Sequence, residues 1–292
     1  MEVKQKSLAD RGLLIATLPL VLILVAFFLI PLGMTALLSF QTTQYYRVVW
    51  TWDLATWQDV FSHWHYWSIM GRTLTMAATC VVLCIVISLP VAYALVHRLA
   101  SLENHVKILI VFAFLTDAVL KTFGWVLFLD RTGVLNGALE AVGMGAQASD
   151  ILFSPNATMI GMVYNLLPYT IFTIYLSLAR IDRDLMLAAY DAGASRLRTF
   201  WEVTLPLARP GIIAGGVLVF VLSLGVFLEP KVMGGGTSPM AAELIRQTFE
   251  TRVNWPLGAA LTLVVIVIGT ATLAITAAVV MRAQKRARGM GQ

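Results

Sequence analysis

Charged residues are scarce in this chain of 292 residues: Asp, Glu, Lys and Arg together make up 13% of it, and hydrophobic residues make up 59%. A soluble globular domain has about 25% charged and 45–50% apolar residues, so the composition excludes an ordinary soluble domain. It also excludes an intrinsically disordered chain, because such chains are polar and poor in aromatic residues. The mean hydropathy of +0.80 instead indicates a protein whose main solvent is lipid.

Residues and motifs that carry catalysis or bind metals are also few. The two cysteines, Cys80 and Cys84, lie one helical turn apart inside an apolar run, and we interpret them as packing residues because two cysteines cannot form a disulfide framework. His63 and His65 are too few ligands for a zinc site. The sequence has no Gly-x-x-x-x-Gly-Lys-Ser/Thr loop for ATP phosphates and no His-Glu-x-x-His motif. We therefore expect no catalytic residue, metal or cofactor in this chain.

Long apolar runs are the main positive feature. A membrane-spanning helix needs about 20 mostly apolar residues, and six runs meet or approach that length: 12–40, 68–96, 106–129, 157–178, 211–228 and 257–280. The sequence predicts an all-α integral membrane protein with six transmembrane helices. Residues 1–11 form the expected N-terminal segment, 12–282 the transmembrane domain, with a loop at 181–210, and 283–292 the C-terminal tail.

The basic residues predict the orientation in the membrane. Six spans place both termini on one side; the segments on that side contain 14 Lys and Arg, and the opposite loops contain five. Because Lys and Arg accumulate in cytoplasmic loops, both termini are expected in the cytoplasm. The net charge of +5 is therefore a consequence of topology, and no nucleic-acid partner is expected. Five of the eight tryptophans fall within residues 50–67, which predicts a segment at the outer membrane interface.

The loop at 181–210, on the predicted cytoplasmic side, has a helical pattern of its own. Asp182 can cap a first helix, and Gly193 suits the left-handed residue that ends it. Ser195 can open a second short helix, which Pro206 is expected to end, and Pro210 is expected to open the next span. Such a hairpin could lie on the membrane surface, or it could dock a soluble partner.

Small side chains in the first helix favour docking. Ala188 and Ala189 would let another protein approach closely, whereas a helix lying on a membrane would need larger apolar anchors. The residues also resemble the signature of ABC-type importer permeases, which reads Glu-Ala-Ala, three residues, Gly, nine residues, Ile-x-Leu-Pro. Every interval matches, and the sequence departs at Leu187, in place of the glutamate, and at Val203, in place of the isoleucine.

The resemblance implies the type I ABC importer permease fold, in which this hairpin is a coupling helix that contacts a separate ATPase. A polar contact made by the missing glutamate could come from Asp184 or Asp191. The residues that the resemblance assigns to coupling are Ala188, Ala189, Asp191, Gly193, Ala194, Leu205 and Pro206.

Further segments resemble the spermidine/putrescine branch of these permeases. They are residues 116–125, 161–168, 233–236 and 254–260. The resemblance implies a heterodimer of two related permeases, two ATPase subunits that bind ATP and Mg²⁺, and an outer solute-binding protein. The solute is expected to be a polyamine or related amine, with an opine, an aminophosphonate or an inorganic anion as alternatives. A secondary carrier is a further alternative, but it would show inverted repeats, which we do not find.

Ionisable residues inside the predicted spans usually mark a pathway. Asp117 and Lys121 lie one turn apart, and either neutralise each other or also line the route. Glu229 either lines the route or pairs at the interface with Lys231 or Arg246. Aromatic faces attract cations, so the candidate pathway also includes Trp125, Tyr164, Tyr169 and Phe227.

Overall fold

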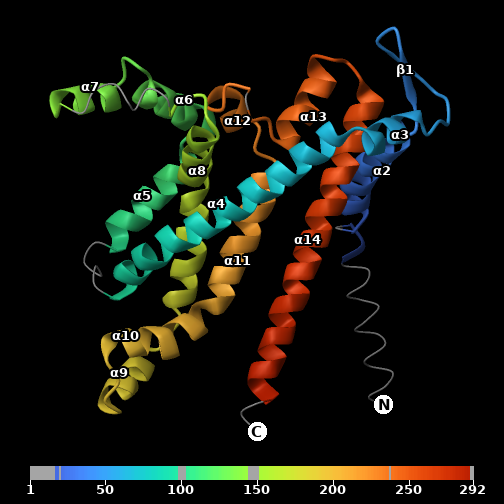
Figure 1. Cartoon of the computed structure of the whole chain (residues 1–292). Helices are drawn as coiled ribbons and strands as arrows, with labels where there is room; N and C mark the ends of the chain where they lie inside the picture. The colour runs from blue at the N-terminus through green and yellow to red at the C-terminus, as the bar shows by residue number, and fades with distance from the viewer. Residues whose placement is uncertain (1–16, 20, 98–102, 144–150, 237, 290–292) are drawn as a thin grey trace, which may run out of the picture. The chain divides into compact units, whose positions relative to one another are not determined.

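The computed structural model describes residues 17–19, 21–97, 103–143, 151–236 and 238–289. They form a mostly helical chain (Figure 1). Its contacts divide it into two compact units. Unit 1 takes its residues from Met1–Trp64 and Ile245–Val267, and unit 2 takes its residues from His65–Leu244 and Ile268–Gln292. The predicted N-terminal segment at 1–11 lies outside the described residues.

Five helices among the described residues are long and apolar enough to cross a membrane, and they agree with five of the six predicted spans. They occupy Thr17–Leu38, Trp64–His97, Pro155–Leu178, Arg196–Leu224 and Trp255–Arg282. The first includes the π-helix η1 (Val25–Leu29) and α2 (Ile30–Leu38); the second is α4 (Trp64–His97) and the third is α8 (Pro155–Leu178). The last belongs to α14, Trp255–Gly289, which continues into the predicted tail.

The third predicted span is not one helix. The chain forms α5 (Glu103–Leu115) and α6 (Ala118–Leu129), and the break falls at Thr116 and Asp117. A short helix, α7 (Val134–Ala141), follows α6. The prediction of a continuous helix over 106–129 was wrong because Asp117 caps the second helix instead of continuing the first.

The fifth predicted span also has different bounds. After α9 (Arg183–Asp191), the short helix α10 (Arg196–Thr199) runs through the π-helix η4 (Phe200–Thr204) into α11 (Leu205–Leu224). Pro206 therefore begins α11 rather than ending a helix, and Pro210 lies inside α11. The Leu205 N–H bonds the Phe200 carbonyl five residues earlier, and this wider turn accommodates a proline ring that would clash in an ordinary α-helix.

Helices α8 and α11 pack along each other in unit 2 (Figure 1). A Cβ atom at Gly211 would overlap Ser177, and one at Gly215 would overlap Thr173. These glycines therefore permit the close approach that the sequence predicts for them. The hairpin α9–α10 lies at one end of this helix pair, and α6 and α12 (Leu228–Val232) lie at the other (Figure 1).

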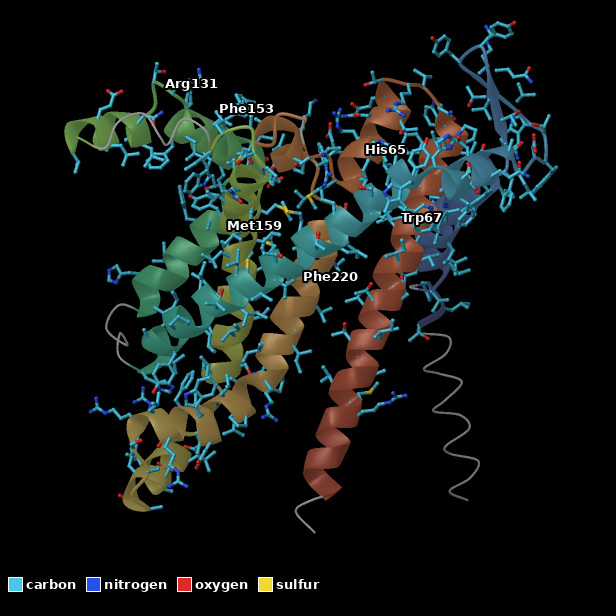
Figure 2. All side chains as sticks on the ribbon, viewed as in Figure 1. His65, Trp67, Arg131, Phe153, Met159 and Phe220 are labelled. Carbon is cyan, nitrogen blue, oxygen red and sulfur yellow. The ribbon has the colours of Figure 1, made fainter. Side chains whose placement is uncertain are left out.

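The core of unit 2 is rich in sulfur. Cys80 and Cys84 are fully buried, and they pack with Met162, Val219 and Met240. Met159, labelled on α8 in Figure 2, packs against the same cluster. The cysteines thus occupy the packing positions predicted for them. A second cluster, centred on Ile174, Leu178 and Ala208, packs α4, α8 and α11 nearer the hairpin.

Unit 1 contains a two-stranded antiparallel hairpin of β1 (Thr42–Gln44) and β2 (Arg47–Val49). Tyr45 and Tyr46 form its tip, and both have positive φ, as the tight turn between twisted strands requires. Helix α3 (Ala55–Ser62) follows, and Trp57 packs against Phe40 with ring centroids 6.0 Å apart. The Thr43 hydroxyl donates a hydrogen bond to the side-chain oxygen of Asn254, just before α14. Helix α13 (Ala241–Glu250) also lies partly in this unit. The interfacial role of residues 50–67 stays a prediction.

Candidate functional site

The break between α5 and α6 is held by charged side chains on both sides. The Asp117 carboxylate accepts a hydrogen bond from the Val119 N–H at 2.7 Å and caps the start of α6. The Lys121 ammonium donates to the Ala113 carbonyl at the end of α5, at 3.2 Å. Each charge therefore satisfies a helix terminus that lacks an intrahelical partner. Asp117 and Lys121 thus have separate backbone partners; the two predicted roles, mutual neutralisation and lining the route, stay predictions.

Glu229 lies in the short helix α12 and is buried, with 5% of its surface exposed. The Asn165 side-chain N–H₂ on α8 donates to its carboxylate at 2.6 Å, and also to the Thr122 hydroxyl on α6 at 3.3 Å. We call these three residues the polar cluster. Glu229 thus has a neutral hydrogen-bond partner in Asn165; the two predicted alternatives, a place on the route and an interfacial ion pair with Lys231 or Arg246, stay predictions.

Small residues on α8 let α12 come close enough to form the polar cluster. Thr158, Gly161 and Asn165 follow one another at helical spacing and share a face. A Cβ atom at Gly161 would lie 2.6 Å from Met233 Sδ and 3.1 Å from Glu229 Cγ. A Cβ atom at Gly234, just after α12, would lie 2.7 Å from the Thr158 hydroxyl. The backbone contact is therefore what places Glu229 beside Asn165.

A cavity of about 690 Å³ opens beside the polar cluster. It brings together five of the seven predicted pathway residues: Asp117, Lys121, Tyr169, Phe227 and Glu229. An adjoining cavity of about 460 Å³ shares Thr116 and Lys121 with the first, and it contains the other two, Trp125 and Tyr164. Their rings meet edge to face with centroids 5.5 Å apart.

Sequence reasoning missed Asn165, Thr122 and Phe114. Asn165 and Phe114 line the larger cavity, and the Phe114 ring meets Tyr169 at a centroid distance of 4.7 Å. An amide in the middle of an otherwise apolar span was the available signal for Asn165, since buried polar groups in a membrane require partners. Phe114 and Thr122 had no distinguishing signal in the sequence.

The larger cavity has the chemistry to hold a small cation. Two carboxylates, Asp117 and Glu229, face it together with the aromatic side chains of Phe114, Tyr169 and Phe227. Carboxylates form charge-assisted hydrogen bonds to ammonium groups, and aromatic faces attract cations. The one described basic side chain in the lining is Lys121, whose ammonium already donates to Ala113.

The second candidate region is the hairpin of α9 and α10. Asp182 caps α9 by accepting from the Asp184 N–H at 3.1 Å, and Ser195 caps α10 by accepting from the Arg198 N–H at 3.3 Å. Gly193 has a φ of +82°. These three predictions are confirmed. The Gly193 N–H bonds the Tyr190 carbonyl at 2.9 Å, and the Ala194 N–H bonds the Ala189 carbonyl at 3.0 Å, which is a Schellman motif.

The hairpin exposes apolar side chains. Leu187 is 56% exposed, Leu197 70% and Trp201 59%, whereas Met186 and Thr199 point inward. The Arg198 guanidinium pairs with Glu202 at 2.9 Å on the exposed surface. Of the residues assigned to coupling, Ala188, Asp191 and Gly193 are exposed, and Ala189, Ala194, Leu205 and Pro206 are half-buried. An exposed apolar surface of this kind is typical of an element that contacts a partner protein or a membrane.

Comparison with known proteins identifies the class. Residues 106–285 match the family model described as "binding-protein-dependent transport system inner membrane component", and the chain belongs to that family of transport permeases. The spermidine/putrescine transport system permease protein PotB of Escherichia coli is 34% identical over 195 residues, which cover 67% of this chain and 71% of PotB. The molybdenum transport permease ModB of Mycobacterium bovis is 28% identical over 193 residues, which cover 66% of this chain and 71% of ModB.

A solved structure supports the fold over nearly the whole chain. A bacterial ABC transporter that imports alginate has a chain similar to this one with a TM-score of 0.71 and 15% identity, covering 97% of this chain and 99% of that one. The fold is therefore that of the ABC importer permeases. The predicted fold class is confirmed, although the described residues contain five long spans and the broken pair α5–α6 rather than six continuous helices.

Proposed function

We propose that this chain is the membrane-spanning subunit of an ATP-driven importer that moves a polyamine or a related small amine across the bacterial inner membrane by alternating access. The observation that carries the proposal is the cavity beside Glu229, where two carboxylates and three aromatic side chains converge. A buried carboxylate at membrane depth is costly, so its usual use is to bind a cation on a pathway. The relative at 34% identity is named for spermidine and putrescine transport.

The hairpin α9–α10 supplies the contact with the motor. This chain has no phosphate-binding loop for ATP, so ATP and Mg²⁺ are bound by two copies of a separate ATPase subunit. We place the hairpin on the cytoplasmic side with both termini, in accord with the distribution of Lys and Arg. Its exposed Leu187, Leu197 and Trp201 seat in the ATPase, and the bend at Gly193 transmits ATPase closure to α11.

The proposed complex contains two further proteins. A solute-binding protein delivers the amine from the outer side, in agreement with the family description. A second, related permease completes the pathway, because Asp117 is exposed in this chain while it lines the cavity. A heterodimer is proposed on the resemblance to the spermidine/putrescine branch.

An anionic solute is the second candidate, and Lys121 is the observation that favours it. Its ammonium lines both cavities, and one relative is named for molybdenum transport. However, the carboxylates of Asp117 and Glu229 in the same lining would repel an anion. The lining therefore favours an amine.

Uptake into proteoliposomes tests the proposal. The permease pair, the ATPase and the binding protein are reconstituted together and offered labelled putrescine, spermidine and molybdate in separate reactions. ATP-dependent accumulation of an amine, lost when the ATPase is omitted, is the expected result. Accumulation of molybdate with no amine uptake would assign the chain to anion transport, and uptake without the ATPase would assign it to secondary carriers.

A further inference from the structure

Four aromatic side chains form a row of ring contacts from the exposed surface of the hairpin to the end of α4. Trp201 is 59% exposed, and the centroids of its ring and the Phe200 ring lie 5.5 Å apart. The Phe200 ring meets the ring of Tyr93, on α4, at a centroid distance of 5.3 Å. Tyr93 in turn meets His97, the last residue of α4, at 4.5 Å. The row therefore connects the surface proposed to seat in the ATPase with a second long helix.

The contact between Phe200 and Tyr93 has the geometry of an attractive pair. The two ring planes stand at 89°, edge to face, and such pairs add to the stability that burial alone provides. Both side chains are half-buried. Tyr93 packs against the second cluster of unit 2, which also receives Ile181 from the start of the hairpin. The end of α4 and the base of the hairpin therefore share one packed region.

Phe200 lies at the point where the hairpin continues into a membrane-spanning helix. It is the first residue of the π-helix η4, and its carbonyl accepts a hydrogen bond from the Leu205 N–H. The backbone of η4 links the hairpin to α11, and the Phe200 ring links the same turn to α4. Single π-turns inside helices are frequent at functional sites. A displacement of Trp201 by a bound partner therefore reaches two helices rather than one.

Helix α4 packs directly against the helices that line the larger cavity. Cys80 and Cys84 of α4 lie in one buried cluster with Leu166 of α8 and Val219 of α11. Leu166 also lines the cavity beside Glu229. Tightly packed interiors transmit displacements because they contain little free space. A movement of α4 therefore alters the cavity wall through this continuous cluster.

We propose that Tyr93 is a positioning residue for coupling: through its contact with Phe200, closure of the ATPase moves α4, and α4 changes the cavity wall. This route acts in addition to the one through α11. The inference rests on the proposed function and adds a second mechanical connection to it. The aromatic ring of Tyr93 makes the contact with Phe200, so the phenol hydroxyl is not required for this role.

The ring contact provides a graded set of variants. Tyr93→Phe keeps the ring and removes only the hydroxyl. Tyr93→Leu and Phe200→Leu each remove one ring of the pair and keep an apolar side chain. Phe249→Leu is the matched control, because Phe249 is also half-buried and meets Trp255 edge to face at 5.6 Å, in unit 1.

The experiment measures the number of putrescine molecules taken up per ATP hydrolysed by the reconstituted complex, with the thermal midpoint of each complex as a second readout. Tyr93→Leu and Phe200→Leu are each expected to lower uptake per ATP by about twofold to tenfold, the range that an edge-to-face pair contributes to an equilibrium. The double variant should lower it no further than one of them, because the effects of residues in contact are not additive. Tyr93→Phe and Phe249→Leu are expected to keep the wild-type ratio. A purely structural role of Tyr93 would lower the thermal midpoint and leave the uptake per ATP of the assembled complexes unchanged.

Each outcome has a distinct meaning. A wild-type complex that takes up no amine contradicts the proposed function itself. A wild-type complex that couples uptake to ATP hydrolysis, with an unchanged ratio in Tyr93→Leu, overturns the role of Tyr93 and leaves the proposed function standing. An equal loss in Tyr93→Phe or in Phe249→Leu overturns that role as well. If Tyr93→Leu does not assemble, Phe200→Leu decides by the same ratio: a lowered value supports the inference, and a wild-type value overturns it.

Discussion

Substitution of Gly193 tests whether the backbone shape of the hairpin couples ATP hydrolysis to transport. Gly193 has a φ of +82°, and a Cβ atom added there would meet nothing within 4 Å. A side chain at this position therefore has room, and its cost is conformational. For an L-residue other than glycine the left-handed region costs about 1–2 kcal/mol, which changes an equilibrium about 5–30-fold.

The substitutions should therefore follow a graded order. Asparagine tolerates the left-handed region best after glycine, alanine should cost about 1–2 kcal/mol, and valine should cost the most because its branched Cβ restricts the backbone further. We expect membrane insertion to be unchanged in all three variants. The Schellman bonds from Gly193 and Ala194 should weaken in the order Asn, Ala, Val.

The assay is the number of amine molecules taken up per ATP hydrolysed by reconstituted complexes. Gly193→Asn should stay close to wild type, Gly193→Ala should fall severalfold, and Gly193→Val should hydrolyse ATP with little uptake. Equal loss in Gly193→Asn and Gly193→Val would refute the reasoning, because it would mean that the empty surface at Gly193 matters rather than its φ. Normal coupling in Gly193→Val would remove the hairpin from the coupling pathway.

Three further experiments test other parts of the account. The side chain of Gly161→Val should overlap Met233 and Glu229 and lower the stability of the assembled complex by about 1–3 kcal/mol, measured as its thermal midpoint. Gly71→Ala is the control. Its added Cβ has no atom within 4 Å, so it should not destabilise the complex. Glu229→Gln keeps an acceptor for Asn165 but removes the charge, and Asp117→Asn likewise removes a charge from the cavity lining. Each single variant should reduce amine uptake about tenfold or more. Unchanged uptake in both variants would exclude the two residues from the route. Asp191 lies in the last turn of α9, where a negative charge is unfavourable. Asp191→Asn should therefore stabilise this helix by about 0.3–1 kcal/mol, measured by hydrogen-exchange protection. If Asp191 replaces the glutamate absent at Leu187, the coupling of ATP hydrolysis to uptake should fall in the same variant.

The long spans and the hairpin caps could be predicted because they depend on local sequence. Apolar length alone placed the helices at Trp64–His97 and Pro155–Leu178. The caps at Asp182 and Ser195 follow from short-range bonds between a side chain and the next turn of backbone. The positive φ of Gly193 follows in the same way from the residue that ends a helix.

The continuous span over 106–129 and the helix end at Pro206 were both predicted wrongly, for different reasons. Hydropathy averages over about 20 residues, so one capping carboxylate at Asp117 did not outweigh the apolar residues on both sides of it. Pro206 looked like a helix end because proline removes a donor. The π-turn at Phe200–Thr204 instead let the helix continue into α11.

The polar cluster could not be predicted because its members are far apart in sequence. Asn165 and Glu229 are separated by 64 residues, and their contact depends on the close packing at Gly161 and Gly234. Sequence reasoning could select Glu229 as an ionisable residue in an apolar region, but the tertiary fold decides what it binds.

Photo-crosslinking at the hairpin tests most directly whether this element docks the ATPase. Leu197 on α10 and Leu120 on α6 are both 70% exposed in the isolated chain, so a benzoylphenylalanine is placed at one or the other position of the assembled complex. The account predicts that the probe at position 197 crosslinks to the ATPase and that the probe at position 120 does not. Crosslinks from position 197 to lipid alone would show that the hairpin lies on the membrane and would contradict the account.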